Sequence, residues 1–330
     1  MKAVVFRAYG KPEEVLKLEE IPTPICGDEE VLVKIKARSV NPSDLYTIMG
    51  LYGVKPKLPA IPGNEAAGVI EEVGKNVKGF SIGDRVTLTI GAAGSLGTWK
   101  EYTTVTPDQI MKTPDALSDE EATSVWANFL TSWILAVDEL KIKPGEQLLV
   151  TAASSHLGRA MIQISKILGF KVVGTVRKEE QKQELLDMGA EDIIVTDTEN
   201  FIKRARKITN VKGFPYAIDA VGGKVGNEAM QSLAPKGTII VYGLMSNEPI
   251  IVPGSIIFTE IIIRGFWLMK WMQNTPIEQK EKSARELIKL FEERKLVSQI
   301  DSKFDLADIQ GYLSRSNTPG RSGKVIITSN

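Results

Sequence analysis

The pattern of hydrophobic and polar positions changes about one third of the way along the chain. Before that point, short runs rich in β-branched residues are separated by Gly, Pro and Asp; the clearest are 31–40 (VLVKIKARSV), 66–74 (AAGVIEEVG) and 84–90 (DRVTLTI). Branched side chains pack well on a pleated surface, so such runs are typical of β-strands. We predict an antiparallel, barrel-like β domain for this part of the chain.

Beyond 113–124 (TPDALSDEEATS), short apolar segments alternate with segments of helical period. The predicted strands are 146–152, 170–176, 192–197, 216–222 and 237–243, with helices at 159–169 and 181–189. This alternation predicts an α/β fold, in which a doubly wound parallel sheet carries helices on both faces. The last part of the chain is predicted to hold one long helix at 278–296 and a final strand at 323–328.

Composition narrows the class of protein. The chain has 330 residues, enough for two domains that each bury a core, and 43% of them are apolar. Its 41 Lys and Arg balance 41 Asp and Glu, so no net field attracts nucleic acid or an anionic membrane. A single cysteine, Cys26, suits a reducing compartment.

No segment predicts export or membrane insertion. The start, MKAVVFRAYG, lacks both the apolar core of a signal peptide and the Arg/Ser-rich pattern of a transit peptide. The most apolar stretch, 250–263, is interrupted by Pro253 and Gly254 and contains Glu260, so we interpret it as a buried strand and helix. We expect a soluble cytoplasmic protein with no membrane and no nucleic-acid partner.

Histidine is scarce, because His156 is the only one in the chain. A catalytic zinc ion takes at least three ligands from His, Cys, Asp and Glu, and a structural zinc usually takes four, mostly Cys. One His and one Cys cannot build either common type, and no acidic cluster has a spacing suited to magnesium. A Ser-His-Asp hydrolase is equally disfavoured, because the chain has no G-x-S-x-G elbow. We expect no bound metal.

The segment 148–158 (LLVTAASSHLG) predicts a nucleotide-binding turn between a strand and a helix. At such a turn, backbone N–H groups and the helix dipole hold a pyrophosphate. The glycine positions of the dinucleotide fingerprint hold Ala153, Ser155 and Gly158, and an ordinary turn is the alternative. The candidate phosphate-binding residues are Ser154, Ser155, His156, Leu157 and Gly158.

Within this turn, His156 has two candidate roles. It either donates to a phosphate oxygen or caps the helix. An imidazole at this place cannot reach a substrate at the far end of the cofactor, so we do not assign His156 as a catalytic base.

The next predicted strand ends in Arg177 and Lys178. In an NAD-binding unit, an acidic residue at this place accepts hydrogen bonds from the ribose hydroxyls, whereas an arginine accommodates a 2′-phosphate. A guanidinium binds a phosphate dianion in bidentate fashion, and a carboxylate would repel it. We therefore predict NADPH as the cofactor, with a solvated basic pair as the alternative.

Several motifs in a fixed order carry a resemblance to a known family: 62–74 (PGNEAAGVIEEVG), the turn at 83–86 (GDRV) and then the predicted nucleotide-binding turn. Over essentially its whole length, the chain resembles the medium-chain dehydrogenase/reductase superfamily. The resemblance implies a GroES-like β-barrel catalytic domain at 1–124, a Rossmann NADPH-binding domain at 125–266 and a return to the catalytic domain at 267–330.

The resemblance is to the zinc-independent branch of this superfamily. In zinc-dependent members, a Cys opens the motif matched by 41–44 (NPSD), and a His stands at the position of Asn64. In this chain both positions are Asn, and the cysteine-rich lobe that holds a structural zinc is missing.

Four further stretches resemble the trans-2-enoyl thioester reductases of the superfamily: 40–65, 96–102 (LGTWKEY), 221–224 (VGGK) and 264–268 (RGFWL). Enoyl reduction needs a hydride for the β-carbon, stabilisation of the enolate oxygen and a proton for the α-carbon. A tyrosine suits the last two roles, because a phenol donates without bringing charge into an apolar pocket. Tyr52 matches the family's proton donor, Tyr46 is a weaker candidate beside it, and Asn41 is assigned to the same catalytic centre.

The resemblance also implies further cofactor contacts. Asn128 matches an asparagine near the nicotinamide ribose, and Lys324 matches a lysine near the cofactor. After Asn128 the chain departs from the family's Pro-Cys-Thr run, which alters the shape of the pocket. The remaining cofactor candidates are Tyr242, Gly243, Leu244, Met245, Phe266, Trp267 and Leu268.

Two alternatives to an enoyl thioester reductase stay open. An NADPH:quinone oxidoreductase shares the PG-x-E-AAG block and takes the same hydride, but it delivers its proton to oxygen. A non-enzymatic NADPH-binding redox sensor is an alternative of a different class. Because 254–263 (GSIIFTEIII) offers an apolar segment beside the open edge of the sheet, we expect a homodimer, with a homotetramer as the alternative.

Overall fold

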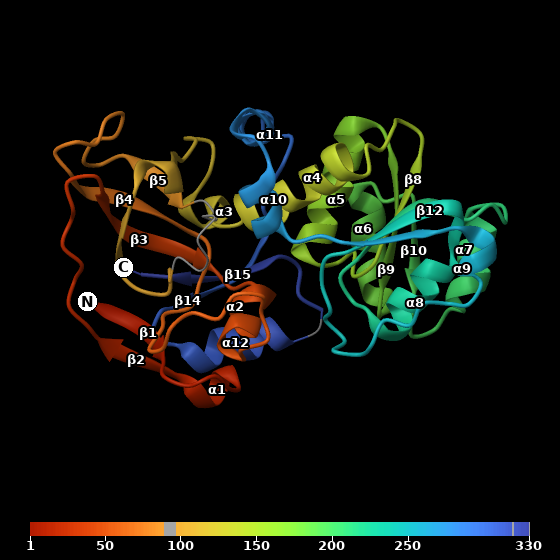
Figure 1. Ribbon diagram of the computed structural model, residues 1–330, viewed down its shortest axis with the longest axis horizontal. Coiled ribbons are helices and arrows are strands. Elements are labelled where there is room, and N and C mark those ends of the chain that lie inside the picture. The colour runs from red at the N-terminus through yellow and green to blue at the C-terminus, as the bar shows by residue number, and fades with distance from the viewer. Residues whose placement is uncertain (89–96, 319, 330) are drawn as a thin grey trace. The chain divides into compact units, whose positions relative to one another are not determined.

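Two compact units make up the chain. The computed structural model describes residues 1–88, 97–318 and 320–329 (Figure 1). By spatial proximity, unit 1 comprises Met1–Ala127 and Ile288–Asn330, and unit 2 comprises Asn128–Leu287. The domain boundaries predicted at 124/125 and 266/267 remain predictions; in this grouping, residues 267–287 fall in unit 2.

Unit 1 is built around a largely antiparallel sheet with the strand order β14-β15-β3-β4-β5-β7, and β6 also pairs with β3. β14 and β15 are parallel, and the other pairs are antiparallel. The strands are β3 (Val31–Ser39), β4 (Ala66–Val73), β5 (Arg85–Leu88), β6 (Tyr102–Val105), β7 (Ile110–Lys112), β14 (Ile300–Asp305) and β15 (Lys324–Thr328). A separate antiparallel pair joins β1 (Lys2–Phe6) to β2 (Leu16–Glu20).

The predicted strands of unit 1 are confirmed in place. The run at 31–40 forms β3, and the run at 66–74 forms β4. The run at 84–90 is a strand as far as Leu88, and residues 89 and 90 lie outside the described residues. In these strands, branched residues such as Val33, Ile35 and Ile70 are fully buried and pack together in one core.

The helices of unit 1 are short: α1 (Pro12–Val15), α2 (Pro42–Ile48), α3 (Asp119–Ala122) and α12 (Ile309–Asn317). The pattern of apolar residues did not predict α2. Its start is nevertheless explained by local chemistry, because Pro42 occupies the first helical turn and the Asn41 N–H donates to Asp44 Oδ2 at 2.8 Å. Helix α2 therefore begins at the stretch assigned to the catalytic centre.

Unit 2 contains a six-stranded parallel sheet in the order β10-β9-β8-β11-β12-β13. The strands are β8 (Gln147–Val150), β9 (Lys171–Val176), β10 (Asp192–Val195), β11 (Phe214–Asp219), β12 (Leu233–Val241) and β13 (Ile262–Gly265). Numbered from β8, this is the order 3-2-1-4-5-6 of the Rossmann fold. The order reverses between β8 and β11, and such switch points are where these sheets bind nucleotides.

Helices cover both faces of this sheet. Leu148 and Leu149 are neighbours on β8 and both are 0% exposed, and because successive strand residues point to opposite faces, both faces are buried. The flanking helices are α5 (His156–Leu168), α6 (Lys182–Met188), α7 (Phe201–Ile208) and α8 (Gly223–Gln231). The α/β prediction with its doubly wound parallel sheet is confirmed (Figure 1).

Two sequence predictions in the last third of the chain need correction. The stretch 250–263 is only partly buried: Ile261 is 7% exposed and lies in the core, whereas Ile251, Ile257 and Phe258 are 65%, 76% and 85% exposed. It forms a loop, the short helix α9 (Ile256–Thr259) and the start of edge strand β13. The helix predicted at 278–296 is α11 (Ile277–Glu292), preceded by α10 (Leu268–Asn274). It ends early because Arg294 has a positive φ of 54°, which a helix cannot continue through.

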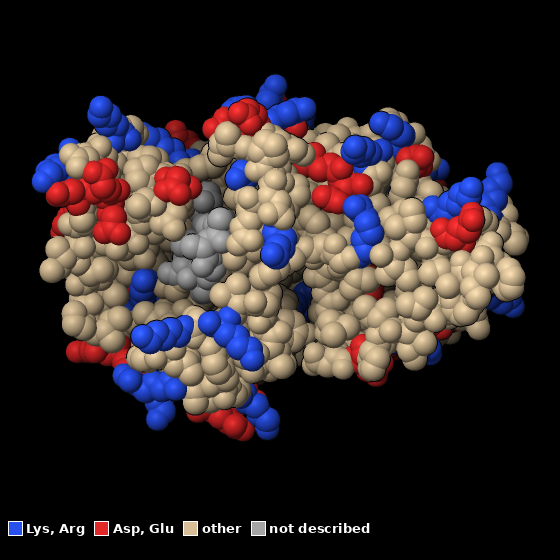
Figure 2. Space-filling view, viewed as in Figure 1, with Lys and Arg blue, Asp and Glu red and all other residues tan. Residues whose placement is uncertain are grey.

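Charged side chains of both signs are interspersed on the face shown in Figure 2, as the balanced composition predicts. Among the described residues, no helix combines the length and the apolar character that crossing a membrane requires.

Candidate functional site

The predicted cofactor residues of unit 2 gather at one edge of its sheet. All strands of a parallel sheet end at the same edge, and nucleotides bind there. Strand β8 runs into the turn at 151–155, and β9 is followed by Arg177 and Lys178. Tyr242 follows β12, and Phe266 follows β13, whose Gly265 is paired with Val241. The fold therefore brings these residues together, as the sequence analysis required.

The turn after β8 has an unusual backbone conformation. Ala152 has a φ of 51°, an uncommon conformation for a residue other than glycine, and its N–H donates to Thr175 Oγ1 at 3.2 Å. The hydroxyl of Ser155 caps α5, because it accepts a hydrogen bond from the Gly158 N–H at 3.1 Å. The capping role considered for His156 therefore belongs to Ser155.

Gly158 leaves no room for a side chain. A Cβ at this position would lie 2.5 Å from the carbonyl oxygen of Ala153 and 2.6 Å from its Cα. The start of α5 and the turn thus pack backbone against backbone, which is the role of the third glycine in a dinucleotide fingerprint. The N-terminus of this 13-residue helix, which is the positive end of its dipole, fits an anionic group such as a pyrophosphate.

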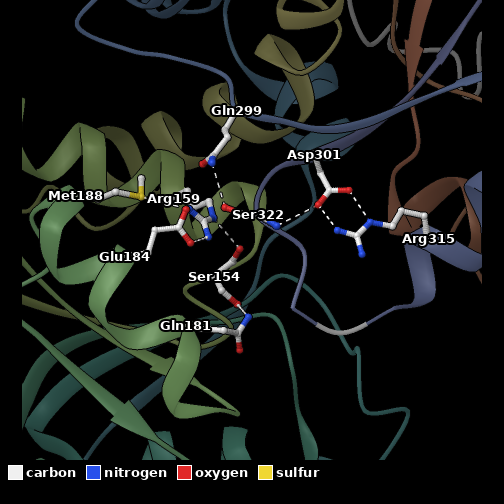
Figure 3. Close-up of polar contacts among 9 residues, drawn as sticks. All are labelled: Ser154, Arg159, Gln181, Glu184, Met188, Gln299, Asp301, Arg315 and Ser322. Carbon is white, nitrogen blue, oxygen red and sulfur yellow. Dashed lines mark hydrogen bonds and ion pairs between the residues drawn. The ribbon is translucent and has the colours of Figure 1, made fainter.

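Arg159 fastens this turn to helix α6 (Figure 3). Its guanidinium binds both carboxylate oxygens of Glu184 at 2.7 Å, and its Nε donates to the Ser154 carbonyl at 3.1 Å. The Ser154 hydroxyl accepts a hydrogen bond from Gln181 Nε2 at 2.9 Å. The turn is therefore tied to the segment that directly follows the predicted 2′-phosphate residues, Arg177 and Lys178, which are both exposed.

Asp219, which the sequence analysis missed, joins this turn to the loop after β11. It is 1% exposed, and its Oδ1 accepts from Thr151 Oγ1 at 2.6 Å and from the Val221 N–H at 3.0 Å. Its Oδ2 accepts from the Gly222 N–H at 2.9 Å. Three donors stabilise a buried carboxylate without a cation. The signal in the sequence was a single acid inside the apolar run YAIDAVG.

Tyr242 supplies a polar group at the same edge. Its hydroxyl is buried and has no hydrogen-bond partner among the described residues. Burial, with the nearby charge of Asp219, raises the pKa of Tyr242, so the side chain stays a neutral phenol. An orphaned buried hydroxyl beside an anion-binding turn fits a polar ligand such as a nicotinamide nucleotide. Leu244 and Met245, which follow, are exposed. A Cβ at Gly243 would lie 2.8 Å from the carbonyl oxygen of Ala220.

Asn128 is half-buried in a π-helical segment, Val125–Leu130, which continues into α4 (Thr131–Ile134). This helical region contacts the nucleotide-binding turn. The Ser132 hydroxyl donates to the Leu157 carbonyl at 3.1 Å, and the rings of Phe129 and His156 meet edge to face with centroids 5.5 Å apart. Trp267 is half-buried and Leu268 is buried at the start of α10.

In unit 1, the predicted residues Asn41 and Lys324 meet in a buried polar cluster. Lys324 Nζ donates to Asn41 Oδ1. Asn41 Nδ2 in turn donates to Glu65 Oε2 at 2.9 Å and to Ser39 Oγ at 3.0 Å. Asp44 and Glu65 are 0% exposed and Lys324 is 4% exposed. The sequence analysis named Asn41 and Lys324 but missed both carboxylates.

The ionisable groups of this cluster are shifted toward their neutral forms. Burial raises the pKa of Asp44 to about 7, against the opposing effects of the Asn41 N–H and the Lys324 charge. Burial also lowers the pKa of Lys324 to about 8, while Glu65 and Asp44 oppose that change. The pKa of Glu65 is raised by burial and held down by Lys324 and by three hydrogen-bond donors.

The chain leading into Lys324 is held by a second set of contacts (Figure 3). Asp301 accepts from Arg315 Nε at 2.7 Å and from the Ser322 N–H at 3.2 Å. Gln299 Nε2 donates to Ser322 Oγ at 3.0 Å. These contacts fix the backbone just before β15.

Zinc does not fit the cluster around Asn41. The former ligand positions carry the amides of Asn41 and Asn64, and the Asn64 amide donates to Asp44 Oδ1 at 2.7 Å. Elsewhere in the described residues, no group of three His, Cys, Asp or Glu side chains is placed to hold a metal ion. The cation that lies here is the ammonium group of Lys324.

The two candidate tyrosines belong to α2 and to the loop after it. Tyr46 is half-buried within α2, and burial raises its pKa. Tyr52 is half-buried in the loop, which is anchored to the helix by the hydrogen bond from the Leu51 N–H to the Tyr46 carbonyl at 2.9 Å. The backbone turns at Gly50, where φ is +72°.

In one chain, a Rossmann-type parallel sheet is joined to a largely antiparallel β unit, and parallel sheets with this strand order bind dinucleotides at their switch point. Residues 27–115 match the family model described as alcohol dehydrogenase GroES-like domain, and residues 157–289 match the one described as zinc-binding dehydrogenase.

Three relatives show how similar the chain is to known proteins. It is 32% identical to the mitochondrial enoyl-[acyl-carrier-protein] reductase of Homo sapiens over 99% of this chain and 88% of that protein. The Escherichia coli quinone oxidoreductase complexed with NADPH has a TM-score of 0.88 at 28% identity and covers 100% of both chains. A mutant form of enoyl thioester reductase from Candida tropicalis has a TM-score of 0.85 at 26% identity, covering 99% of both chains. The chain belongs to the medium-chain dehydrogenase/reductase superfamily.

The close packing of Gly158 against the Ala153 backbone gives a first prediction. We expect Gly158→Ala to displace the Ala153 backbone, to destabilise the protein by about 1 to 3 kcal/mol and to weaken nicotinamide nucleotide binding. Thermal unfolding and nucleotide fluorescence measure the two effects. Gly254→Ala is the control, because a Cβ at Gly254 meets nothing within 4 Å. Unchanged nucleotide binding in Gly158→Ala would contradict the assignment of this turn.

Proposed function

We propose that the chain is an NADPH-dependent reductase that transfers hydride to an activated double bond, with a trans-2-enoyl thioester as the substrate. The observation that carries this proposal is the loop after α2 that carries Tyr52, which we call the tyrosine loop. It follows a helix whose start is part of a buried cluster that does not fit zinc. The chain as a whole is similar to an enoyl-[acyl-carrier-protein] reductase over 99% of its length. That it is an oxidoreductase follows from its family. A small molecule is therefore the expected partner.

NADPH is supported as the cofactor by the charge beyond β9. Arg177 and Lys178 are exposed, and no ion pair among the described residues engages them. A free guanidinium at this place matches a 2′-phosphate, which NADH lacks. The E. coli quinone oxidoreductase, whose structure was determined with NADPH, is one of the relatives with the same fold.

In the proposed reaction, the cofactor would supply the hydride. The turn after β8, Tyr242 and Asn128 would hold the cofactor. Tyr52 would donate a hydrogen bond to the enolate oxygen and a proton to the α-carbon. A phenol suits this task because it stays neutral at physiological pH. We assign Asn41 a positioning role beside Tyr52, because both donor hydrogens of its amide are bound to Ser39 and Glu65.

A quinone is the second candidate substrate, and the similarity to E. coli quinone oxidoreductase favours it. Both reactions use the same hydride, but a quinone receives its proton on oxygen and does not need a proton donor at carbon. The requirement for Tyr52 therefore separates the two substrates.

We further propose that the protein is cytoplasmic and forms a homodimer through β13. This strand lies at the edge of the unit 2 sheet, where Ile262 is 49% exposed, and the preceding Ile257 and Phe258 are even more exposed. An unpaired edge strand flanked by exposed apolar groups is a site for strand pairing with a second copy.

Cofactor preference is tested by Arg177→Asp. We expect the Michaelis constant for NADPH to rise about ten- to hundredfold relative to that for NADH, because a charge-assisted contact to phosphate is replaced by repulsion. Steady-state kinetics with both nucleotides gives the ratio. Arg206→Asp, which changes an exposed arginine on α7, is the control. The assignment fails if both variants show the same ratio as the parent protein.

The role of Tyr52 is tested by Tyr52→Phe, with NADPH absorbance followed against 2-hexenoyl-CoA and a benzoquinone side by side. We expect thioester turnover to fall on the order of 10²-fold or more, since general acid catalysis is lost, while quinone turnover changes little. Tyr46→Phe tests the weaker candidate in the same way, and Tyr102→Phe is the matched control. Near-normal thioester reduction by Tyr52→Phe would remove Tyr52 from the mechanism, and turnover of the quinone alone by the parent protein would favour the second candidate.

A further inference from the structure

The amide of Asn41 is fully engaged on both of its ends. Its two Nδ2 hydrogens bind Glu65 and Ser39, and its Oδ1 accepts from Lys324. Its backbone N–H is bound to Asp44. A rotation of the side-chain amide would therefore break contacts to β15, to the segment before β4 and to β3 at the same time.

Charge balance explains how this cluster can be buried. Two carboxyl groups, Asp44 and Glu65, share one ammonium group, that of Lys324, and all three are almost completely excluded from solvent. A buried charge without compensation is strongly unfavourable. Glu65 has three hydrogen-bond donors, from Ser39, Asn41 and Ala127, so it is the better site for the negative charge. The cluster is neutral when Asp44 holds a proton.

The cluster holds two segments that the proposed reaction uses. Asp44 lies in the first turn of α2 and accepts hydrogen bonds from the Asn41 N–H at 2.8 Å and from Asn64 at 2.7 Å. Helix α2 leads into the loop that carries Tyr52. Glu65 Oε1 accepts from the Ala127 N–H at 2.6 Å, one residue before Asn128.

We propose that Asp44, Glu65 and Lys324 are positioning residues that act as one buried charge cluster: they fix the Asn41 amide and the start of α2, and thereby the place of the tyrosine loop. This rests on the proposed function for the reaction that the loop serves. Whether the protonation of Asp44 depends on the charge of Lys324 can be tested without any substrate.

The charged and titratable groups that face Asp44 come from several elements. They are Lys324 on β15 and Glu65 before β4, with Arg321 acting on Lys324. Removing the Lys324 ammonium leaves two carboxyls without a cation. The proton on Asp44 should then be held to higher pH, whereas loss of a contact with no charge would not move it.

The substrate-free test is a pH titration followed by infrared spectroscopy. We expect a carboxylic-acid band that disappears as the pH rises through about 7 and that is absent in Asp44→Asn. In Lys324→Met, the midpoint should move upward by about one pH unit or more. The double variant Glu65→Gln/Lys324→Met, which restores neutrality, should return the midpoint toward that of the parent protein and should fold if Lys324→Met does not. A midpoint that Lys324→Met leaves unchanged, or no band assigned to Asp44, would overturn the proposal.

The kinetic test uses Glu65→Gln, with Glu72→Gln on β4 as an exposed control. Misplacement of a reacting group by a fraction of an ångström to one ångström lowers turnover on the order of 10²-fold, so we expect such a loss of kcat in Glu65→Gln. The dissociation constant for NADPH should change much less than kcat, because Glu65 contacts Ala127 beside Asn128 but no residue of the nucleotide-binding turn. An equal loss of NADPH affinity, or a normal kcat, would count against a positioning role. If the parent protein reduces no substrate, the infrared result still decides whether the cluster exists.

Discussion

The burial of one lysine between two carboxyl groups is the constraint on which the arrangement of the proposed catalytic residues of unit 1 depends. Lys324 is far along the chain from Asp44 and Glu65, and the three residues come together around Asn41, whose backbone N–H binds Asp44 and whose side-chain amide binds Glu65 and Lys324. Breaking such a buried pair by removing one partner typically costs about 3 to 5 kcal/mol, because it leaves a charge without compensation. The same contacts set the start of α2, so stability and the geometry of the tyrosine loop are linked.

A different constraint determines the arrangement of the predicted nucleotide-binding residues in unit 2. In a parallel sheet, every strand delivers its carboxyl end to one edge, and there the turn after β8, the loop after β11 and Tyr242 meet. The turn is held from three directions: by Thr175 on β9, by Asp219 through Thr151, and by Arg159 through its bond to the Ser154 carbonyl. This keeps Ala152 in its uncommon conformation and fixes the N-terminus of α5.

The sequence predicted most of the fold because its strands carry a local signal. Runs such as those at 31–40 and 170–176 are long enough, apolar enough and well enough bounded by turns to be recognised without tertiary information. Helix α2 escaped prediction because its apolar residues are few, although the sequence NPSD contained its start signal. The stretch 250–263 was predicted to be buried but is so only in part, since apolar character alone does not distinguish a buried strand from an exposed edge.

The candidate site was predicted in part for a related reason. Gly158 and the basic pair Arg177 and Lys178 could be predicted because each stands at a fixed spacing within a local motif. Glu65 and Asp219 each stand alone in an apolar run, which signals a buried acid but not its partners. Lys324 and Asn41 are 283 positions apart, and their contact could be inferred only from a resemblance.

If the cluster works as proposed, the ammonium group of Lys324, and not a metal ion, supplies the positive charge beside the proposed catalytic residues. The most direct measurement is NADPH oxidation with 2-hexenoyl-CoA after exhaustive treatment with a chelator, with metal content determined on the same sample. We expect unchanged turnover in protein that contains no stoichiometric metal. Loss of activity that added zinc restores would contradict it.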